Sequence, residues 1–444
     1  MVAGALLLPA GAHAQAQNGL PNLFGGIFSG STPAPAQPTP GPGGTPTGPL
    51  PWTGEDGASG HPLMTAAAIR EAAGNFNNCV AGMWPDAARR GVTQENFQRF
   101  TAGLSPDLRI MDLMDSQPEF TKSIWAYLDI LVNDNRLAKG REVLSQYKAQ
   151  FDATERATGV DRYIIASIWG IESNYSTQMG DRSVLQSTAT LACIGRRQAY
   201  FKDEFLSALE ILNRGDLRPE QLRGSWAGAF GPTQFMPTAF KRFAVDGDGR
   251  RDVVDNPTDL IASTANNLKK DGWQPGKTWG YEVVVPQGFN YMLADRAKAM
   301  PIAQWEKLGL KRATGQPFPH PADKAYLLAP AGAQGPGFLM LQNYRVIMKY
   351  NPAEAYALAI GHFADRLRGG QPFVQSWPRQ ERELSRSERL ELQQLLAQRG
   401  FYKGTPDGQF GGQTREALRN FQASIGAPAD GFASSDMLDR LRGR

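Results

Sequence analysis

One glutamate, Glu172, lies within the apolar stretch 164–175. It follows Ile168 by four residues and Trp169 by three, and these intervals place its carboxyl group on the apolar face of a predicted helix. Burial makes the ionised form of a carboxyl group costly, so we predict a raised pKa and a proton that is retained near neutral pH. Such a group can protonate a leaving oxygen as a general acid. The alternatives are a buried structural glutamate paired with an arginine, or a helix end that emerges into solvent.

Two other features could cross-link the chain or bind a metal. Cys79 and Cys193 are the only cysteines, and in an oxidising compartment such a pair favours a disulfide over two buried thiols. The segment 246–255 has the alternating acidic residues of a calcium loop, but Arg250 takes the third alternating position and Pro257 stands where a glutamate is needed. Asp-Gly turns also occur in loops without metal. We therefore predict a disulfide, and no metal or cofactor.

The elements that must position Glu172 are mostly helical. A helical apolar pattern runs through 66–152, and Asp161 is a suitable N-cap for the helix that carries Glu172. The same pattern predicts the helices 196–213, 257–270 and 353–368, and short strands at 282–285 and 325–328. The fold class is therefore mainly α, with a small β insertion.

Composition divides the chain into five parts. Residues 1–14 have the short apolar core and the small-x-small pattern that end a secretory signal peptide, and no Lys or Arg precedes the core, which fits a start upstream of Met1. Residues 15–62 are rich in Pro, Gly, Ala and Thr and should form a disordered tether. A central domain over 66–370, a linker over 371–383 and a compact unit over 384–444 follow.

Charge and hydropathy exclude several classes of function. The net charge of +4 is slight for 444 residues, and no block of Lys or Arg predicts a nucleic-acid-binding surface. No apolar run is long enough to span a bilayer, and no Cys follows the signal core, so we expect no stable membrane anchor. Together with the signal peptide, this predicts an exported, soluble protein of the periplasm.

Several short motifs follow Glu172 in a definite order. They are the segments 172–175, 196–201, 224–237 and 343–351, with Gly180, Val184 and residues 190–192 between the first two. In this order and spacing they resemble the lytic murein transglycosylase B family, whose members cleave the glycan strands of bacterial peptidoglycan. The resemblance covers about 66–370 and implies a lysozyme-like catalytic domain. Ser176 departs from the family pattern, which usually has Gly after the aromatic residue; this affects a turn rather than the acid.

The resemblance implies that Glu172 works without a second carboxylate. In the family, one acid protonates the oxygen between N-acetylmuramic acid and N-acetylglucosamine. Its conjugate base then accepts the proton of the C6 hydroxyl, which closes on C1 and leaves a 1,6-anhydro end. A glycoside hydrolase typically uses two carboxylates instead. The substrate-binding residues carried over from the family are Ser225, Gln234, Arg196, Arg197, Tyr200, Asn343 and Tyr350.

Each substrate-binding assignment has a structural alternative. Ser225 could cap a helix, and the arginine pair could be solvated surface charges. Tyr200 could pack in the core instead of stacking on a sugar ring. Asn343 and Tyr350 could pack at the start of a helix.

The last unit carries a resemblance of its own. Its Gly and Asp-Gly turns and its Phe, Leu and Gln positions resemble the peptidoglycan-binding module, a small three-helix domain. These positions are Leu392-Gln393, Leu395, Gly400-Phe401-Tyr402, Gly404, Asp407-Gly408, Phe410-Gly411, Thr414, Ala417, Phe421-Gln422 and Asp430-Gly431. Such a module would hold the enzyme on the wall and raise the effective substrate concentration. We therefore predict a peptidoglycan lytic transglycosylase. Its rivals are a hydrolytic muramidase and a non-catalytic wall-binding or scaffold protein.

Overall fold

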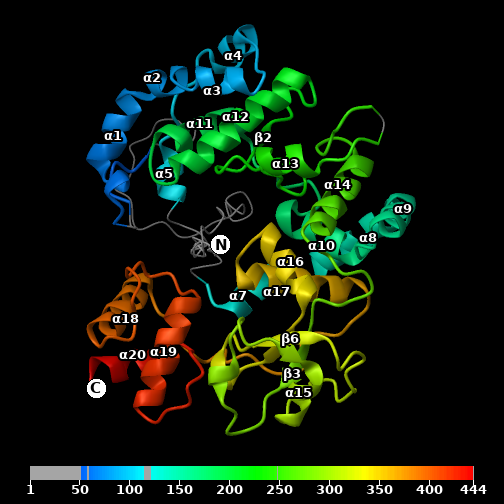
Figure 1. Ribbon diagram of the computed structural model, residues 1–444, viewed down its shortest axis with the longest axis vertical. Coiled ribbons are helices and arrows are strands. Elements are labelled where there is room, and N and C mark those ends of the chain that lie inside the picture. The colour runs from blue at the N-terminus through cyan, green and yellow to red at the C-terminus, as the bar shows by residue number, and fades with distance from the viewer. Residues whose placement is uncertain (1–51, 58–59, 115–121, 248, 444) are drawn as a thin grey trace, which may run out of the picture.

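The computed structural model describes residues 52–57, 60–114, 122–247 and 249–443. The predicted signal peptide, and the predicted tether up to residue 51, lie outside these residues. The described protein is mainly helical, as predicted, with a small β-sheet insertion, a two-stranded pairing of β1 (Arg182–Ser183) with β2 (Arg223–Gly224), and a helical unit at the C-terminal end (Figure 1). None of the helices in these ranges is long and apolar enough to cross a lipid bilayer.

The first lobe combines helices from two separate parts of the chain (Figure 1). Helices α11 (Val184–Cys193) and α12 (Gln198–Arg214) pack along each other at its centre, and short N-terminal helices cover them. The core of this lobe includes Phe201, Phe205 and Phe230. The other helices are α1 (Ala66–Gly74), α2 (Phe76–Ala81), α3 (Trp84–Arg89), α4 (Gln94–Thr101), α5 (Arg109–Leu113) and α13 (Pro237–Phe243).

A disulfide between Cys79 and Cys193 joins α2 to the last residue of α11. The two cysteines are 114 residues apart, so the bridge closes a long loop. Because a cross-link over this separation restricts the unfolded chain, reduction should lower the free energy of unfolding by about 2–4 kcal/mol. We expect calorimetry to show a lower melting temperature in the presence of a reducing agent. The variant Cys79→Ala/Cys193→Ala should be insensitive to the reductant, and an unchanged melting temperature of the reduced wild type would contradict the prediction.

The second lobe is built around α10 (Arg162–Ser173), the helix that carries Glu172. Every residue of α10 from Ile164 to Ser173 is buried, because the helix packs against α17 (Glu354–Leu367) on one side and α8 (Asp134–Gln146) on another. Asp161 caps α10 as predicted, since its carboxylate accepts a hydrogen bond from the backbone N of Tyr163 at 2.8 Å. The other helices of this lobe are α7 (Ile124–Leu131), α9 (Lys148–Thr158), α14 (Pro257–Lys270) and α16 (Gln342–Tyr350).

An antiparallel five-stranded sheet is inserted between α14 and α16 (Figure 1). Its strand order is β4-β6-β7-β3-β5, and Leu339 of the central strand faces Tyr281 on one neighbour and Leu327 on the other. Two of these strands match the predicted ones to within two residues. The elements are β3 (Gly280–Val284), β4 (Met300–Pro301), α15 (Ile302–Lys307), β5 (Lys311–Arg312), β6 (Lys324–Leu328) and β7 (Gly337–Met340).

The C-terminal unit is the predicted three-helix domain, formed by α18 (Arg386–Gln398), α19 (Gly412–Ser424) and α20 (Ser435–Arg442). It has a small core of its own that includes Leu392, Leu418 and Leu438. Gln393 is fully buried, and its Oε1 accepts hydrogen bonds from the backbone N of Asp407 at 2.9 Å and of Gly408 at 2.7 Å. The Asp-Gly turn seen in the sequence is therefore held against α18.

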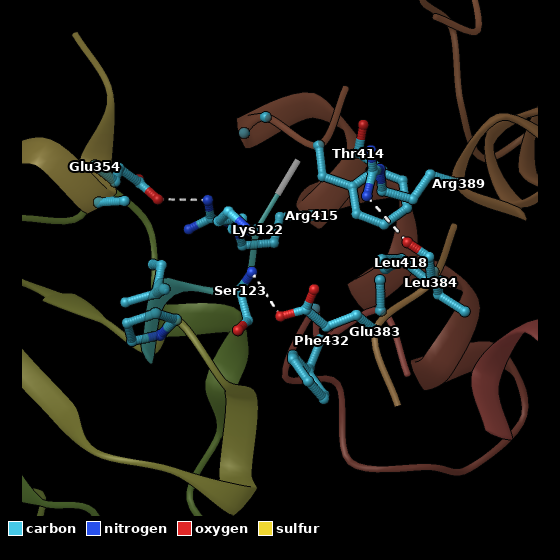
Figure 2. A pocket seen from close by; sticks show the side chains of 18 of the residues that line it. Lys122, Ser123, Glu354, Glu383, Leu384, Arg389, Thr414, Arg415, Leu418 and Phe432 are labelled. Atoms are coloured by element: carbon cyan, nitrogen blue, oxygen red, sulfur yellow. Dashed lines mark hydrogen bonds and ion pairs between the residues drawn. The ribbon is translucent and has the colours of Figure 1, made fainter. Parts of the chain in front are cut away.

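The segment 371–383, predicted as a linker, lies along the second lobe. The Phe373 ring stacks on His362 of α17 with 3.8 Å between centroids, and Arg379 pairs with Asp129 of α7 at 2.5 Å. A pocket lies between the second lobe and the C-terminal unit, and side chains of both line it (Figure 2). The C-terminal unit is therefore docked on the second lobe at a defined place.

Candidate active site

Glu172 lies in the last turn of α10 with 1% of its surface exposed. Its Oε1 accepts a hydrogen bond from the hydroxyl of Tyr356, on α17, at 2.7 Å. The hydroxyl of Tyr350, at the end of α16, donates to the backbone O of Thr233 at 2.6 Å. Burial, and then the charge of the nearby Glu172 carboxylate, raise the pKa of both tyrosines well above the ordinary value. Both hydroxyls are therefore neutral donors near physiological pH.

The chain turns sharply directly after the acid. Asn174, Tyr175 and Ser176 all have left-handed backbones, with φ of 48°, 55° and 70°. Such conformations cost on the order of 1–3 kcal/mol each for residues other than Gly and are characteristic of functional sites. The Ser176 hydroxyl accepts from Trp169 Nε1 at 3.0 Å, and its backbone N donates to Ser173 Oγ at 2.9 Å. The positive φ at position 176 explains why a glycine suits this turn, and the bond from Trp169 offsets part of the cost of serine.

Ser225 and Gln234 shape the loop that lies beside this turn. Ser225 is buried, and its Oγ accepts from the backbone N of Ala229 at 3.1 Å; this bond closes a turn of the loop and is not the helix cap named as its alternative, because residues 225–236 form no helix. Gln234, also buried, has a φ of 52°, and its Nε2 donates to the backbone O of Met179 at 3.1 Å and of Gly231 at 2.9 Å. Gln234 thus ties the loop to the chain that follows α10. Direct contact of either residue with a sugar stays a prediction.

Tyr350 connects this loop to the acid. Its hydroxyl holds the loop at Thr233, its ring lies 6.4 Å from that of Phe235, and the Glu172 charge acts on it. Tyr350 thus lies close to the acid, and its contact with a sugar stays a prediction.

Arg196, Arg197 and Tyr200 come together at the start of α12, in the first lobe. The Arg197 guanidinium lies over the Tyr200 ring at 4.7 Å, and Arg196 Nη2 donates to the backbone O of Met114 at 3.2 Å. Tyr200 also makes an edge-to-face contact with Phe201 at 5.1 Å, and its side chain is hydrogen-bonded to Glu204. Because Arg197 covers a face of the Tyr200 ring, a sugar could stack on that face only if the guanidinium moved.

Asn343 is placed as a structural residue. It is fully buried, its Nδ2 donates to the backbone O of Gln274 at 2.9 Å and of Lys277 at 2.6 Å, and its Oδ1 accepts from the backbone N of Gln274 at 2.8 Å. Its amide therefore holds the loop 274–277 against the start of α16. This is the packing role that was the alternative to glycan contact.

Sequence reasoning missed Tyr356. It lies in the predicted helix 353–368, among alanines and leucines that indicate only core packing. The contact with Glu172 depends on how α17 packs on α10, which spacing along the chain does not reveal. The signal that could have found it is the residue type, because a tyrosine on the buried face of a helix needs a hydrogen-bond partner for its hydroxyl.

The acidic loop 246–255 uses its carboxylates to organise its own backbone. Asp252 Oδ1 accepts from the backbone N of Val254 at 3.0 Å and of Asp255 at 2.9 Å, and its Oδ2 pairs with Arg250 at 2.6 Å. Among the described residues, which omit Asp248, no group of three or more His, Cys, Asp or Glu could hold a metal ion. This part of the loop does not fit a calcium site, because the Asp252 carboxylate is paired with the Arg250 guanidinium and hydrogen-bonded to the backbone of its own loop.

A buried carboxyl group at a helix end, hydrogen-bonded to a tyrosine in a mainly helical domain, can serve as the general acid of an enzyme that cleaves glycans. Residues 75–365 match the family described as Transglycosylase SLT domain, and residues 385–441 match a peptidoglycan binding domain. The chain belongs to the Transglycosylase SLT family, as the motifs indicated.

Relatives of this chain cover most of its length. It is 42% identical to SltB3 from Pseudomonas aeruginosa, solved in complex with NAG-anhNAM-pentapeptide, over 83% of this chain and 99% of that one, with a TM-score of 0.79. It is 28% identical to the membrane-bound lytic murein transglycosylase B of Escherichia coli K12 over 312 residues, 66% of this chain and 84% of the relative. Slt35 of Escherichia coli, solved in complex with calcium, is 27% identical over 66% of this chain and 92% of that one, with a TM-score of 0.55.

Proposed function

We propose that this lytic transglycosylase cleaves the β-1,4 bond between N-acetylmuramic acid and N-acetylglucosamine and leaves 1,6-anhydromuramic ends, with Glu172 as general acid and then as base. The observation that carries the proposal is the buried Glu172 carboxyl group, which accepts a 2.7 Å hydrogen bond from Tyr356. The SltB3 relative was solved with a NAG-anhNAM-pentapeptide, which supports the same class of substrate and product.

The two roles of Glu172 follow from its surroundings. In the first step the acid gives its proton to the glycosidic oxygen as the C1–O bond breaks, and burial favours the protonated form that this step needs. In the second step the carboxylate accepts the proton of the C6 hydroxyl as the C1–O6 bond forms, so no water is consumed. The Tyr356 hydroxyl stabilises the carboxylate between the two steps, because hydrogen bonds to a charged acceptor are the stronger ones.

Action in the periplasm is part of the proposal. The predicted signal peptide supports export, and the disulfide between Cys79 and Cys193 suits an oxidising compartment. Peptidoglycan lies in the same compartment.

The end groups of the products test the proposal directly. Purified protein is incubated with sacculi, and the released fragments are analysed by mass spectrometry. Anhydro ends are expected, whereas reducing ends would show that the protein is a hydrolytic muramidase.

A muramidase would also need a second carboxylate, and Glu204 is a buried one that sequence reasoning did not consider. It lies on α12 in the first lobe, and it accepts hydrogen bonds from Thr238 N at 2.9 Å and Thr238 Oγ1 at 2.7 Å. Burial raises the pKa of Glu204. These contacts favour a structural role that joins α12 to α13.

The contribution of Tyr356 can be measured with the variant Tyr356→Phe. Removing the hydroxyl withdraws a donor from the ionised form of Glu172, so the pKa of the acid should rise. Since the first step needs the protonated acid, the alkaline limb of the pH–rate profile should move to higher pH, and kcat should fall by about 10-fold. Tyr163→Phe, on the same helix as Glu172 but near its other end, is the control. A Tyr356→Phe profile that matches the wild type would contradict the assigned contact.

A further inference from the structure

The C-terminal unit contacts the second lobe and the β-sheet insertion through buried or half-buried polar groups. Arg415 of α19 pairs with Glu354 of α17, as Figure 2 shows. Arg419, on the same helix, donates to the backbone O of Ala294 at 3.0 Å. Asp430 Oδ2 accepts from the backbone N of Ala333 at 2.9 Å. Three separate points thus hold the unit on the catalytic domain.

Glu354 makes two ion pairs at this contact. Its side chain is 11% exposed, and it accepts from both Arg415 and Arg296, the latter at 2.6 Å. Burial by itself would raise the pKa of this carboxyl group, but Arg415 and Arg296 together lower it to about 2. Glu354 is therefore ionised at neutral pH. The ion pairs are poorly screened, so loss of one partner leaves a charge with incomplete compensation.

Glu354 begins the helix that holds the acid in place. It is the first residue of α17, and Tyr356, two residues further on, donates to Glu172 Oε1 at 2.7 Å. The Tyr344 hydroxyl donates to the backbone O of Glu354 at 2.9 Å and holds the same turn. Residues 355–364 of α17 are all buried, so the helix can shift little except at its first residue, Glu354. A shift of the turn at Glu354 would move the Tyr356 hydroxyl relative to the acid.

We propose that Arg415, a residue of the peptidoglycan-binding unit, is a positioning residue for Glu172, because its ion pair with Glu354 fixes the first turn of α17 and with it the Tyr356 hydroxyl. The inference rests on the proposed role of Glu172. It makes the wall-binding unit part of the active enzyme, even for a substrate that the unit does not bind.

The test uses the full chain and short soluble glycan strands, which remove any contribution of wall binding to the rate. Arg415→Met replaces the arginine with an unbranched apolar side chain and so removes the guanidinium charge. We expect kcat to fall by about 3- to 30-fold with KM nearly unchanged, and the alkaline limb of the pH–rate profile to move to higher pH. Arg415→Lys, which keeps the charge, should restore part of the loss. Glu354→Gln is the second variant, with the same expected direction, in case Arg415→Met folds poorly.

A double variant separates positioning from other effects. In the Tyr356→Phe background, Arg415→Met should change neither kcat nor the pH limb further, because both act through one hydroxyl. The same loss in both backgrounds would overturn the inference and assign Arg415 a general structural or long-range electrostatic role. Arg379→Met, which breaks the exposed pair with Asp129, is the matched control and should behave as wild type.

The outcomes also distinguish this inference from the proposed function. If Glu172→Gln is inactive and Arg415→Met turns over short glycans like the wild type, only the inference fails. If Glu172→Gln remains active, the proposed function fails first.

Discussion

Glu172→Gln should lower kcat on sacculi by about 10³-fold or more, because one side chain supplies the proton transfer of both steps. Glutamine has nearly the same shape, and its amide oxygen can still accept the hydrogen bond from Tyr356. The fold should therefore be preserved, and the loss should reflect the missing proton. Turnover is measured by chromatography of the released muropeptides, at matched melting temperature.

The same variant tests the rival reading as a scaffold protein. Binding of Glu172→Gln to sacculi, measured by co-sedimentation, should stay close to that of the wild type, since the C-terminal unit is unchanged. Lysis by the variant at the wild-type rate would rule out Glu172 as the acid. Absence of lysis by both proteins, with binding retained, would support a scaffold.

Gly180→Ala should lower the free energy of unfolding by more than about 3 kcal/mol, since it combines backbone strain with a collision between main chains. Gly180 has a φ of 83°, and a Cβ atom there would lie 2.3 Å from the backbone O of Gly224 and 3.1 Å from the backbone N of Ser225. Neither neighbour is a flexible side chain that could move aside. The contact also joins the turn after Glu172 to the Ser225 loop, so activity should fall as well.

Gly215→Ala is the matched control for this prediction. Gly215 ends α12 with a φ of 72°, yet a Cβ atom there would meet nothing within 4 Å. Its cost should be that of the left-handed backbone alone, about 1 kcal/mol. Chemical denaturation of both variants gives the difference. Equal losses would mean that the contact between Gly180 and Gly224 is not rigid.

The sequence predicted the main elements because their apolar patterns are regular. The helix 257–270 was predicted with its observed bounds, and the helix 353–368 differs from α17 by one residue at each end. The strands β4, β5 and β7 were missed: β4 and β5 have two residues each and form only by pairing at the edges of the sheet, and β7 is a four-residue run whose own pattern does not identify a strand. The Asp161 cap was predictable because capping is a local effect.

The site was predictable only where its chemistry is local. Burial of Glu172 followed from the apolar residues on its own helix. The contact with Tyr356 and the ion pair between Glu354 and Arg415 join residues far apart in the sequence, so periodicity gives no sign of them. The packing role of Asn343 depends on the loop 274–277, which only the folded chain brings to it.

The course of the segment 371–383 along α17 and α7 bears on how an anchored enzyme selects its cleavage point. Phe373 and Arg379 hold this segment against α17 and α7, so the catalytic domain and the wall-binding unit keep a defined separation. The distance along the glycan between the anchoring point and the scissile bond is then set by the protein itself. We therefore expect fragments of a defined length, and a more flexible segment 371–383 should broaden the lengths of the fragments that are released.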